Sequence, residues 1–450
     1  MRLAVIGGGG FRVPLVYGAL LRDTGEPRID EVALYDVSAD RLEAIRHVLD
    51  GLAAGHDHPP KVHVTTDLDT ALHGADFVFS AIRVGGLAGR AADERIALDL
   101  GVLGQETTGP GGISFGLRTV PVAVRLAERV AAAAPRAWVI NFTNPAGMIT
   151  EAMRRVLGDR VVGICDSPVG LVRRAAAALG LDPARVSPQY AGLNHLGWLT
   201  GLSCDGVDVL PRLLDDVDAL RRVEEARLFG LDWVRTLDAL PNEYLYYYYF
   251  TREAIAAMTD AGRTRGEALR DQQERFYAAV RGRPGRALDE WRRTRHERDA
   301  GYMAEARERA AAGERDPADL EAGGYEGVAL ALMAALARGE PATMILNVAN
   351  GTAVPGLPAD AVVEVPCAVD GSGIRPLATR PLPGHFLGLL QQVKAVEQTT
   401  IEAALTGSAR LAVQAFALHP LVDSVGTARA LLDAYRARIP ELAAVLPHAG

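Results

Sequence analysis

Short apolar runs alternate with longer, alanine-rich stretches over the first 165 residues of the chain. The runs cover residues 2–6, 31–36, 76–81, 137–142 and 161–165. Runs of this length are typical of buried strands, and the stretches between them are long enough for helices. Strands that alternate with helices predict an α/β fold with a doubly wound parallel sheet.

In the second half of the chain, the hydrophobic pattern predicts both strands and long helices. The segment around residues 204–206 predicts a hairpin, and long helices rich in arginine and glutamate are expected from there to about residue 315. Residues 361–367 predict a later strand pair, and helices end the chain. We therefore expect one domain over residues 1–165 and a second, mixed α+β domain over residues 166–450.

Four consecutive glycines follow the first predicted strand and precede a predicted helix that starts at Phe11. Glycines allow the backbone to approach a pyrophosphate closely, and the N-terminus of a helix attracts its negative charge. The second predicted strand ends in Asp36, where a carboxylate can bind the ribose hydroxyls of NAD. The alternative is that Asp36 only starts a turn with Ser38 and Asp40. The pattern predicts a Rossmann-type NAD site at Gly7, Gly8, Gly9, Gly10, Phe11 and Asp36.

Composition excludes several other classes of protein. The chain of 450 residues is long enough for two domains, and its net charge of −8 argues against a nucleic-acid or anionic membrane partner. Three cysteines are too few for a disulfide framework, which favours a cytoplasmic location. No apolar run reaches the roughly 20 residues that span a membrane. These properties agree with the nucleotide-binding enzyme that the glycine motif predicts.

Polar residues follow two of the predicted strands, at the edge where open α/β sheets form their sites. Asn144 could bind a substrate hydroxyl or make an Asx turn before Pro145. Cys165 could be a metal ligand or a small core residue, and the adjacent Asp166 could merely begin the next helix. His195 lies in an otherwise apolar segment, and together with Cys165 it suggests a divalent metal with open positions. The alternative is a core histidine beside an unrelated cysteine.

Two further groups of side chains could carry chemistry. Five tyrosines occur within the six positions 244–249, and one of them could act as a base if a cation or metal lowered its pKa. Three arginines flank the pair Gly85-Gly86 and suit an anionic group on a substrate, although they could equally be exposed helix charges. They are Arg83, Arg90 and Arg95.

These segments, taken in order along the chain, resemble glycoside hydrolase family four, the NAD- and metal-dependent glycosidases, and in particular the 6-phospho-β-glucosidases. The resemblance implies that the second domain is similar to the C-terminal domains of lactate and malate dehydrogenases, and it implies a homodimer or homotetramer. The matching segments run nearly from end to end: 7–10, 104–112, 141–145, 192–195, 241–250, 364–367 and 419–421.

The resemblance also implies a redox route to bond cleavage. NAD+ takes a hydride from C3 of the sugar, and Mn2+ or another divalent metal held by Cys165 and His195 stabilises the enediolate that forms at C2. Tyr244 matches the base that removes the C2 proton, and Glu106 matches the carboxylate that supports it. Elimination of the aglycone, addition of water and return of the hydride complete the hydrolysis of a 6-phospho-β-glucoside.

The same resemblance assigns binding roles to four polar residues. Arg90 and Asn144 match substrate-binding positions, and Arg265 matches an arginine near the active site. Arg83 is assigned to the cofactor.

The chain departs from the family pattern at residues 10–12 and at Asp166. Relatives carry Ser-Ser-Tyr where this chain has Gly10-Phe11-Arg12, so Arg12 is expected to bind the phosphate in place of the hydroxyls. Asp166 resembles the aspartate that protonates the leaving group in α-specific members. The alternatives are therefore a 6-phospho-α-glucosidase and a glycosidase for sugars without phosphate. A 2-hydroxyacid-type dehydrogenase and a dinucleotide-sensing regulator without activity also stay open.

Overall fold

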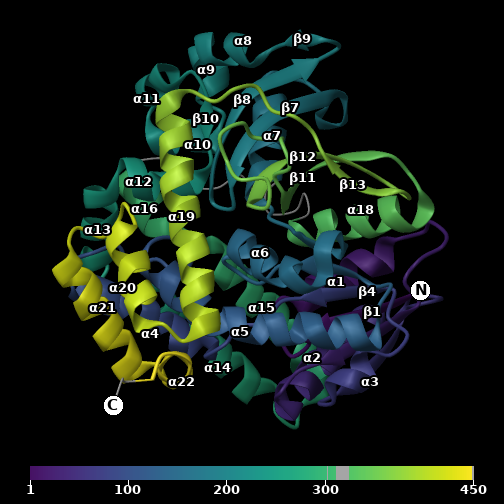
Figure 1. The fold of residues 1–450 in the computed structure, drawn as a ribbon. Helices are drawn as coiled ribbons and strands as arrows, with labels where there is room; N and C mark the ends of the chain where they lie inside the picture. Colours follow the sequence, from purple (N-terminus) through teal and green to yellow (C-terminus); the bar gives the residue numbers. More distant parts are fainter. Residues whose placement is uncertain (302, 311–323, 448–450) are drawn as a thin grey trace.

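The computed structural model describes residues 1–301, 303–310 and 324–447, and within them 13 strands form one sheet (Figure 1). The strands from the start of the chain are all parallel to their neighbours. Across the sheet they are β3 (Lys61–Thr65), β2 (Glu31–Tyr35), β1 (Arg2–Ile6), β4 (Phe77–Ser80), β5 (Trp138–Asn141) and β6 (Val161–Gly163). This is the strand order of a doubly wound sheet, so the predicted α/β fold is confirmed.

The sheet continues into the second half of the chain. The added strands are β11 (Ala342–Ala349), β12 (Val362–Asp370), β7 (Val186–Leu193), β8 (Leu196–Cys204) and β10 (Leu240–Pro241), with β13 (Gly373–Pro376) on β12 and β9 (Val207–Asp208) on β8. β11 joins β6 in antiparallel register where Asn347 faces Gly163. The second half is mixed, as predicted, and the predicted hairpin is the β8–β9 turn. The domain boundary at residue 165 stays a prediction, because the sheet crosses it without a break.

Helices cover both faces of this sheet. Those of the first half are α1 (Val13–Arg22), α2 (Ala39–Ala53), α3 (Leu68–Leu72), α4 (Gly86–Asp99), α5 (Pro110–Ala133), α6 (Ala146–Leu157) and α7 (Ser167–Ala178). Those that follow are α8 (Leu210–Asp215), α9 (Val217–Leu220), α10 (Glu224–Phe229), α11 (Leu231–Leu237), α12 (Tyr246–Tyr249), α13 (Thr251–Asp260), α14 (Arg265–Val280), α15 (Ala287–Ala300) and α16 (Ala304–Arg309). The last are α18 (Tyr325–Arg338), α19 (Gly384–Thr406), α20 (Ala409–Leu418), α21 (Val425–Arg438) and α22 (Pro440–Val445). The helix predicted for residues 311–315 lies outside the described residues.

Two hydrophobic cores lie on opposite faces of the parallel strands, because successive residues of a strand point to opposite faces. Leu3 and Val5 of β1 belong to the core that includes α1, α2 and α18. Ala4 and Ile6 belong to the core that includes α5 and α6. The C-terminal helices α20 and α21 pack into this second core, and Figure 1 shows them beside α4 and α5. The C-terminal helices therefore stabilise the parallel strands at the other end of the sequence.

The connection between β1 and α1 is longer than the sequence predicted. Helix α1 begins at Val13, with Arg12 at the N-cap position, whereas the sequence predicted a helix from Phe11. The turn between β1 and α1 therefore covers residues 7–12, which we call the glycine loop. The polar residues that follow β5 and β6 lie at the same edge of the sheet as this loop. This edge carries the site.

Candidate active site

A cavity of about 1170 Å³ lies at the carboxyl ends of β1, β4, β5 and β6 and reaches into the second half of the chain. It brings together most of the residues that the sequence singled out. Those that line it are Gly7, Gly10, Phe11, Arg12, Asp36, Arg83, Arg90, Glu106, Asn144, Cys165, Asp166, His195, Tyr244 and Arg265. Gly8, Gly9 and Arg95 are absent from the lining.

The glycine loop needs glycine for two different reasons. Gly7 has a φ of 90°, and a Cβ there would lie 2.6 Å from the carbonyl oxygen of Ala81, so only glycine fits beside the cavity. A Cβ at Gly8 would lie 2.7 Å from Cβ of Leu34 on β2. Gly8 therefore allows the loop to pack against the sheet, and its predicted contact with the cofactor, like that of Gly9, stays a prediction.

Asp36 makes the turn that the sequence offered as an alternative, and its predicted contact with the ribose stays a prediction. Its Oδ1 accepts the backbone N–H of Ser38 at 3.1 Å, which forms the expected turn, and its Oδ2 accepts the N–H of Gly9 at 3.1 Å. Each carboxylate oxygen can accept a second hydrogen bond, and Asp36 lines the cavity. The residue can therefore fix the glycine loop and still bind ribose hydroxyls.

Phe11 has a different environment from the one expected of a cofactor contact. Its side chain is only 5 % exposed and packs against Phe276 and Trp291, with ring centroids 5.3 and 6.1 Å apart. The side chain thus anchors the loop to α14 and α15. The sequence could not show this, because both partners lie far along the chain.

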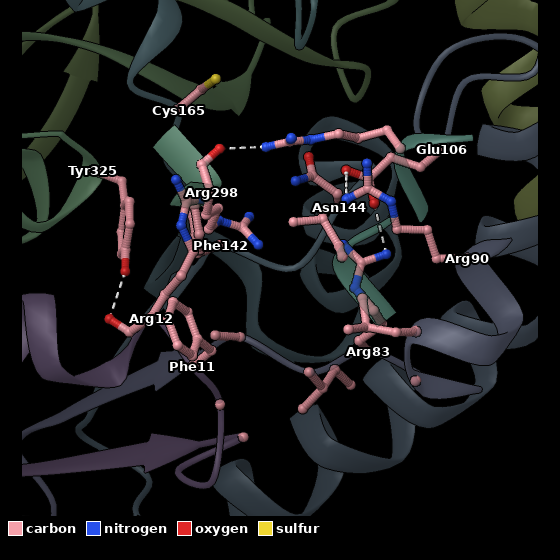
Figure 2. A pocket seen from close by; sticks show the side chains of 18 of the residues that line it. Phe11, Arg12, Arg83, Arg90, Glu106, Phe142, Asn144, Cys165, Arg298 and Tyr325 are labelled. Carbon is pink, nitrogen blue, oxygen red and sulfur yellow. Dashed lines mark hydrogen bonds and ion pairs between the residues drawn. The ribbon is translucent and has the colours of Figure 1, made fainter. Parts of the chain in front are cut away.

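Glu106 connects two arginines of the cavity (Figure 2). Its Oε2 lies 2.7 Å from Nη1 of Arg83, and its Oε1 lies 2.7 Å from Nη1 of Arg90. Burial raises the pKa of Glu106, but the two guanidinium groups outweigh burial and lower the pKa to about 2. Glu94 accepts Nε of Arg90 at 2.8 Å from its other side. Glu106 is therefore a fixed carboxylate at neutral pH.

Arg298 was missed by the sequence analysis, although it lines the cavity beside Arg12. Burial and the charge of Arg12 lower the pKa of Arg298 to about 9. Arg90 and Arg265 lower this pKa further and Glu106 opposes them, so cationic groups predominate around Arg298. The guanidinium of Arg12 lies 4.8 Å from the ring centroid of Tyr325. Arg265 donates to the backbone oxygen of Arg298 at 2.6 Å.

Arg95, the third arginine of the predicted group, does not line the cavity. It forms an ion pair with Glu267, with 2.8 Å between Nη2 and Oε2. Its role is to attach α4 to the start of α14, which agrees with the structural alternative. Asn144, in contrast, faces the cavity and makes no hydrogen bond with the described residues, which favours ligand binding over an Asx turn.

Cys165 and His195 both line the cavity from separate elements. Cys165 follows β6 and is 5 % exposed, and burial raises the pKa of its thiol. His195 sits in the tight β7–β8 turn with a φ of 64°, and burial lowers its pKa to about 4. Its Nδ1 lies 3.0 Å from Oγ1 of Thr107, which leaves Nε2 for a ligand. A buried thiol and a neutral imidazole suit a divalent cation, which would hold the sulfur as thiolate.

These two residues alone do not complete a metal site. Among residues 1–301, 303–310 and 324–447, no group of three His, Cys, Asp or Glu side chains is placed to hold a metal ion. A metal on Cys165 and His195 would therefore keep coordination positions open. Open positions are what a catalytic metal needs to bind substrate oxygens.

A buried hydrogen-bond network supports the turn that carries His195. Asn194 donates to Oε1 of Glu364 at 3.2 Å, and Asn347 donates to the same oxygen at 2.9 Å. Tyr190 donates to Oε2 at 3.2 Å. Glu364 is fully buried, and burial raises its pKa to about 7. The network joins β7, β11 and β12 behind the turn and fixes the direction of the imidazole.

Tyr244 contacts one of the candidate metal ligands directly. Its ring stacks on His195 with centroids 3.6 Å apart and an interplanar angle of 3°. Tyr247 also lines the cavity, whereas Tyr249 accepts a hydrogen bond from Trp198 at 3.0 Å. Most of the cluster therefore belongs to the core, and the role of Tyr244 as a base stays a prediction.

Asp166 occupies the N-cap position of α7 but makes no side-chain cap. Its carboxylate lines the cavity, and a Cβ on Gly324 would lie 3.2 Å from its Oδ2. The simple capping alternative for this residue therefore does not account for its side chain. The catalytic role of Asp166 stays a prediction.

The fold and the cavity are those of a dinucleotide-binding α/β enzyme with a candidate metal site. Two family models match the chain and identify its family. The model "Family 4 glycosyl hydrolase" matches residues 2–181, and "Family 4 glycosyl hydrolase C-terminal domain" matches residues 190–422. The chain belongs to glycosyl hydrolase family 4, and the predicted family and glycosidase class are confirmed.

Relatives within the family act on both anomers. A probable 6-phospho-beta-glucosidase of Bacillus subtilis is 32% identical over 98% of both chains. A 6-phospho-alpha-glucosidase of Leptotrichia buccalis is 31% identical over 96% of both chains. The solved 6-phospho-beta glucosidase of Thermotoga maritima with manganese, NAD+ and glucose-6-phosphate is 27% identical, with a TM-score of 0.82 over 98% of this chain and 99% of that chain.

A more distant structure tests the expected dehydrogenase-like architecture. Malate dehydrogenase of Plasmodium falciparum matches 90% of this chain and 99% of that chain, with a TM-score of 0.51 and 13% identity. At this identity the match concerns the fold alone, and there it agrees with the prediction. None of the described helices is both long and apolar enough to cross a membrane.

Proposed function

We propose that this chain hydrolyses the O-glycosidic bond of 6-phospho-β-glucosides and uses NAD+ and a divalent metal, Mn2+, as cofactors. The observation that carries the proposal is the stack of Tyr244 on His195 in the cavity that the glycine loop also lines. A candidate base, a candidate metal ligand and a dinucleotide loop thus share one space. The names of the relatives and the ligands of the Thermotoga structure support it.

The residues fit these cofactors and have separate tasks. Bound NAD+ would supply a hydride acceptor, and a metal on Cys165 and His195 would supply a Lewis acid. Tyr244 removes the proton from C2 of the sugar. Glu106 stays ionised between its arginines, so it holds Arg90 in place and keeps a negative charge near the base. Asn144 binds a sugar hydroxyl.

The positive charge around Arg12 and Arg298 selects an anionic sugar. Both guanidinium groups line the cavity, and burial together with the charge of Arg12 lowers the pKa of Arg298 to about 9. Tyr325 and Asp166 outweigh burial at Arg12 and raise its pKa, so the excess positive charge lies on the Arg298 side. A phosphate on C6 would balance it and accept charge-assisted hydrogen bonds from Arg12. We therefore assign Arg12 to the phosphate, in place of the hydroxyls of its relatives.

A second candidate is the α-anomer of the same substrate. It is favoured by the carboxylate of Asp166, which lines the cavity without capping α7 and could protonate a leaving group.

The assembly is a homodimer or homotetramer in the cytoplasm. The family resemblance supports the oligomer, and the scarcity of cysteine supports the location.

The proposal is tested with α- and β-linked nitrophenyl glucosides, each with and without the 6-phosphate, in the presence of NAD+ and Mn2+. We expect release of nitrophenol from the β-linked phosphorylated substrate above the other three. Preference for the α-linked phosphorylated substrate would select the second candidate. No release from any of the four would contradict the proposal.

The Arg12→Ser variant tests the phosphate assignment in the same panel. Loss of a charge-assisted contact is expected to lower kcat/KM for the phosphorylated substrate by roughly 10- to 100-fold. Rates on sugars without phosphate should change little. Arg46→Ser is the matched control, because Arg46 pairs with Asp50 outside the cavity. An equal loss on both kinds of substrate would show that Arg12 does not bind the phosphate.

A further inference from the structure

Three aromatic side chains from the second half of the chain donate hydrogen bonds to the glycine loop. Each bond ends on a backbone carbonyl, and each donor lies on a different helix, α14, α15 or α18. The bonds are Tyr277 Oη to Gly9 O at 2.7 Å, Trp291 Nε1 to Phe11 O at 2.8 Å and Tyr325 Oη to Arg12 O at 2.8 Å. Figure 2 draws the last of them. We call the three donors the aromatic clasp.

The donors of the aromatic clasp are held rigidly and keep their protons. Trp291 and Tyr325 are buried, and the ring of Tyr277 packs edge-on against Phe276 with centroids 4.9 Å apart. Burial raises the pKa of both tyrosine hydroxyls. Phe11 packs against Phe276 and Trp291, so the same helices hold the side chain and the backbone of the loop.

The direction of these carbonyls matters for a dinucleotide. Tyr277 and Trp291 do not line the cavity, so the carbonyls of Gly9 and Phe11 point away from it. Peptide groups next to glycine rotate easily, and a carbonyl oxygen turned toward a diphosphate would repel it. A loop that is already fixed loses less conformational freedom when the ligand binds. Val13 N–H already donates to Gly10 O and Leu15 N–H to Arg12 O, so among the described residues the N–H groups of Phe11 and Arg12 are the ones left in this turn for phosphate oxygens.

We propose that Tyr277, Trp291 and Tyr325 are positioning residues that set the affinity for NAD+ by holding the glycine loop in its binding conformation. The inference rests on the proposed function, because it takes NAD+ as the ligand of the loop. It adds that residues in the second half of the chain determine how tightly the cofactor is retained. A cofactor that returns its hydride in each turnover must stay bound, and the aromatic clasp serves this retention.

The test is the dissociation constant of NAD+, measured by isothermal titration calorimetry on the full chain without metal or sugar. Tyr277→Phe removes the hydroxyl and keeps the ring, and we expect the Kd to rise about three- to tenfold. Tyr325→Phe should have a similar effect, and the double variant should lose more than either. Tyr249→Phe is the matched control, because it loses a hydrogen bond to Trp198 away from the loop.

Three outcomes would overturn the inference or its basis. An NAD+ Kd of wild-type size in both Tyr277→Phe and Tyr325→Phe would overturn the inference alone. An equal rise in Tyr249→Phe would also overturn it, because general loosening of the fold would then be the cause. A wild-type chain that binds no NAD+ would overturn the proposed function as well.

The Mn2+ affinity of Tyr277→Phe should match the wild type, because this side chain does not line the cavity.

Discussion

Replacing Tyr244 with Phe is expected to lower the rate of glycoside hydrolysis by about 10²- to 10⁴-fold, the usual range for loss of a general base. The phenyl ring can keep the stack on His195, whose centroid lies 3.6 Å away, so the binding of NAD+ and Mn2+ should survive. The measurement is the exchange of the C2 proton with deuterated solvent, followed by NMR, together with the release of aglycone.

Tyr246→Phe controls for the loss of a phenol from the same cluster. Tyr246 is buried and does not line the cavity, so its replacement should leave exchange at C2 unchanged. Wild-type exchange in the Tyr244→Phe chain would remove Tyr244 as the base. Loss of exchange accompanied by loss of Mn2+ binding would instead indicate a structural role beside His195.

Cys165→Ala is expected to weaken Mn2+ binding by at least about 100-fold, because even the loss of a residue that only supports a ligand costs 10- to 100-fold. Hydrolysis should fall with it, since the open metal positions must hold the sugar oxygens. The affinity for NAD+ should stay near the wild-type value, because Cys165 does not belong to the glycine loop. Mn2+ binding is measured by electron paramagnetic resonance of the free ion.

Cys367→Ala is the matched control for this change. Cys367 is also buried, but it lies within β12, and its Sγ is 3.4 Å from the carbonyl oxygen of Val365. Both variants remove a buried thiol, and only one removes a candidate ligand. Equal Mn2+ affinity in the two variants would show that Cys165 is not a metal ligand.

The parallel half of the sheet could be predicted because its signal is local. Each strand is a short apolar run, and alternation of its side chains fills the two cores. The continuation of the sheet could not be predicted in this way. β6 meets β11 only where Gly163 faces Asn347, and no local pattern records a pairing between residues so far apart.

In the candidate site, too, some residues have a local signal in the sequence and others have none. Cys165, His195 and Asn144 follow strands or interrupt apolar segments, and such polar residues are visible in a sequence. Arg298 lies in a helix with several other arginines, so nothing local distinguishes it. Glu364 had a usable signal, because it is an acidic residue within an apolar strand. Its fully buried carboxylate anchors the turn that carries His195.

The central claim is that the bound dinucleotide is used and restored within each turnover. The most direct test follows hydrolysis of a 6-phosphoglucoside in deuterated water with less NAD+ than substrate. We predict that each NAD+ supports the release of many aglycones, that NADH does not accumulate and that the product carries deuterium at C2. NADH formed in proportion to the substrate consumed, with no deuterium at C2, would contradict it and identify a net dehydrogenase.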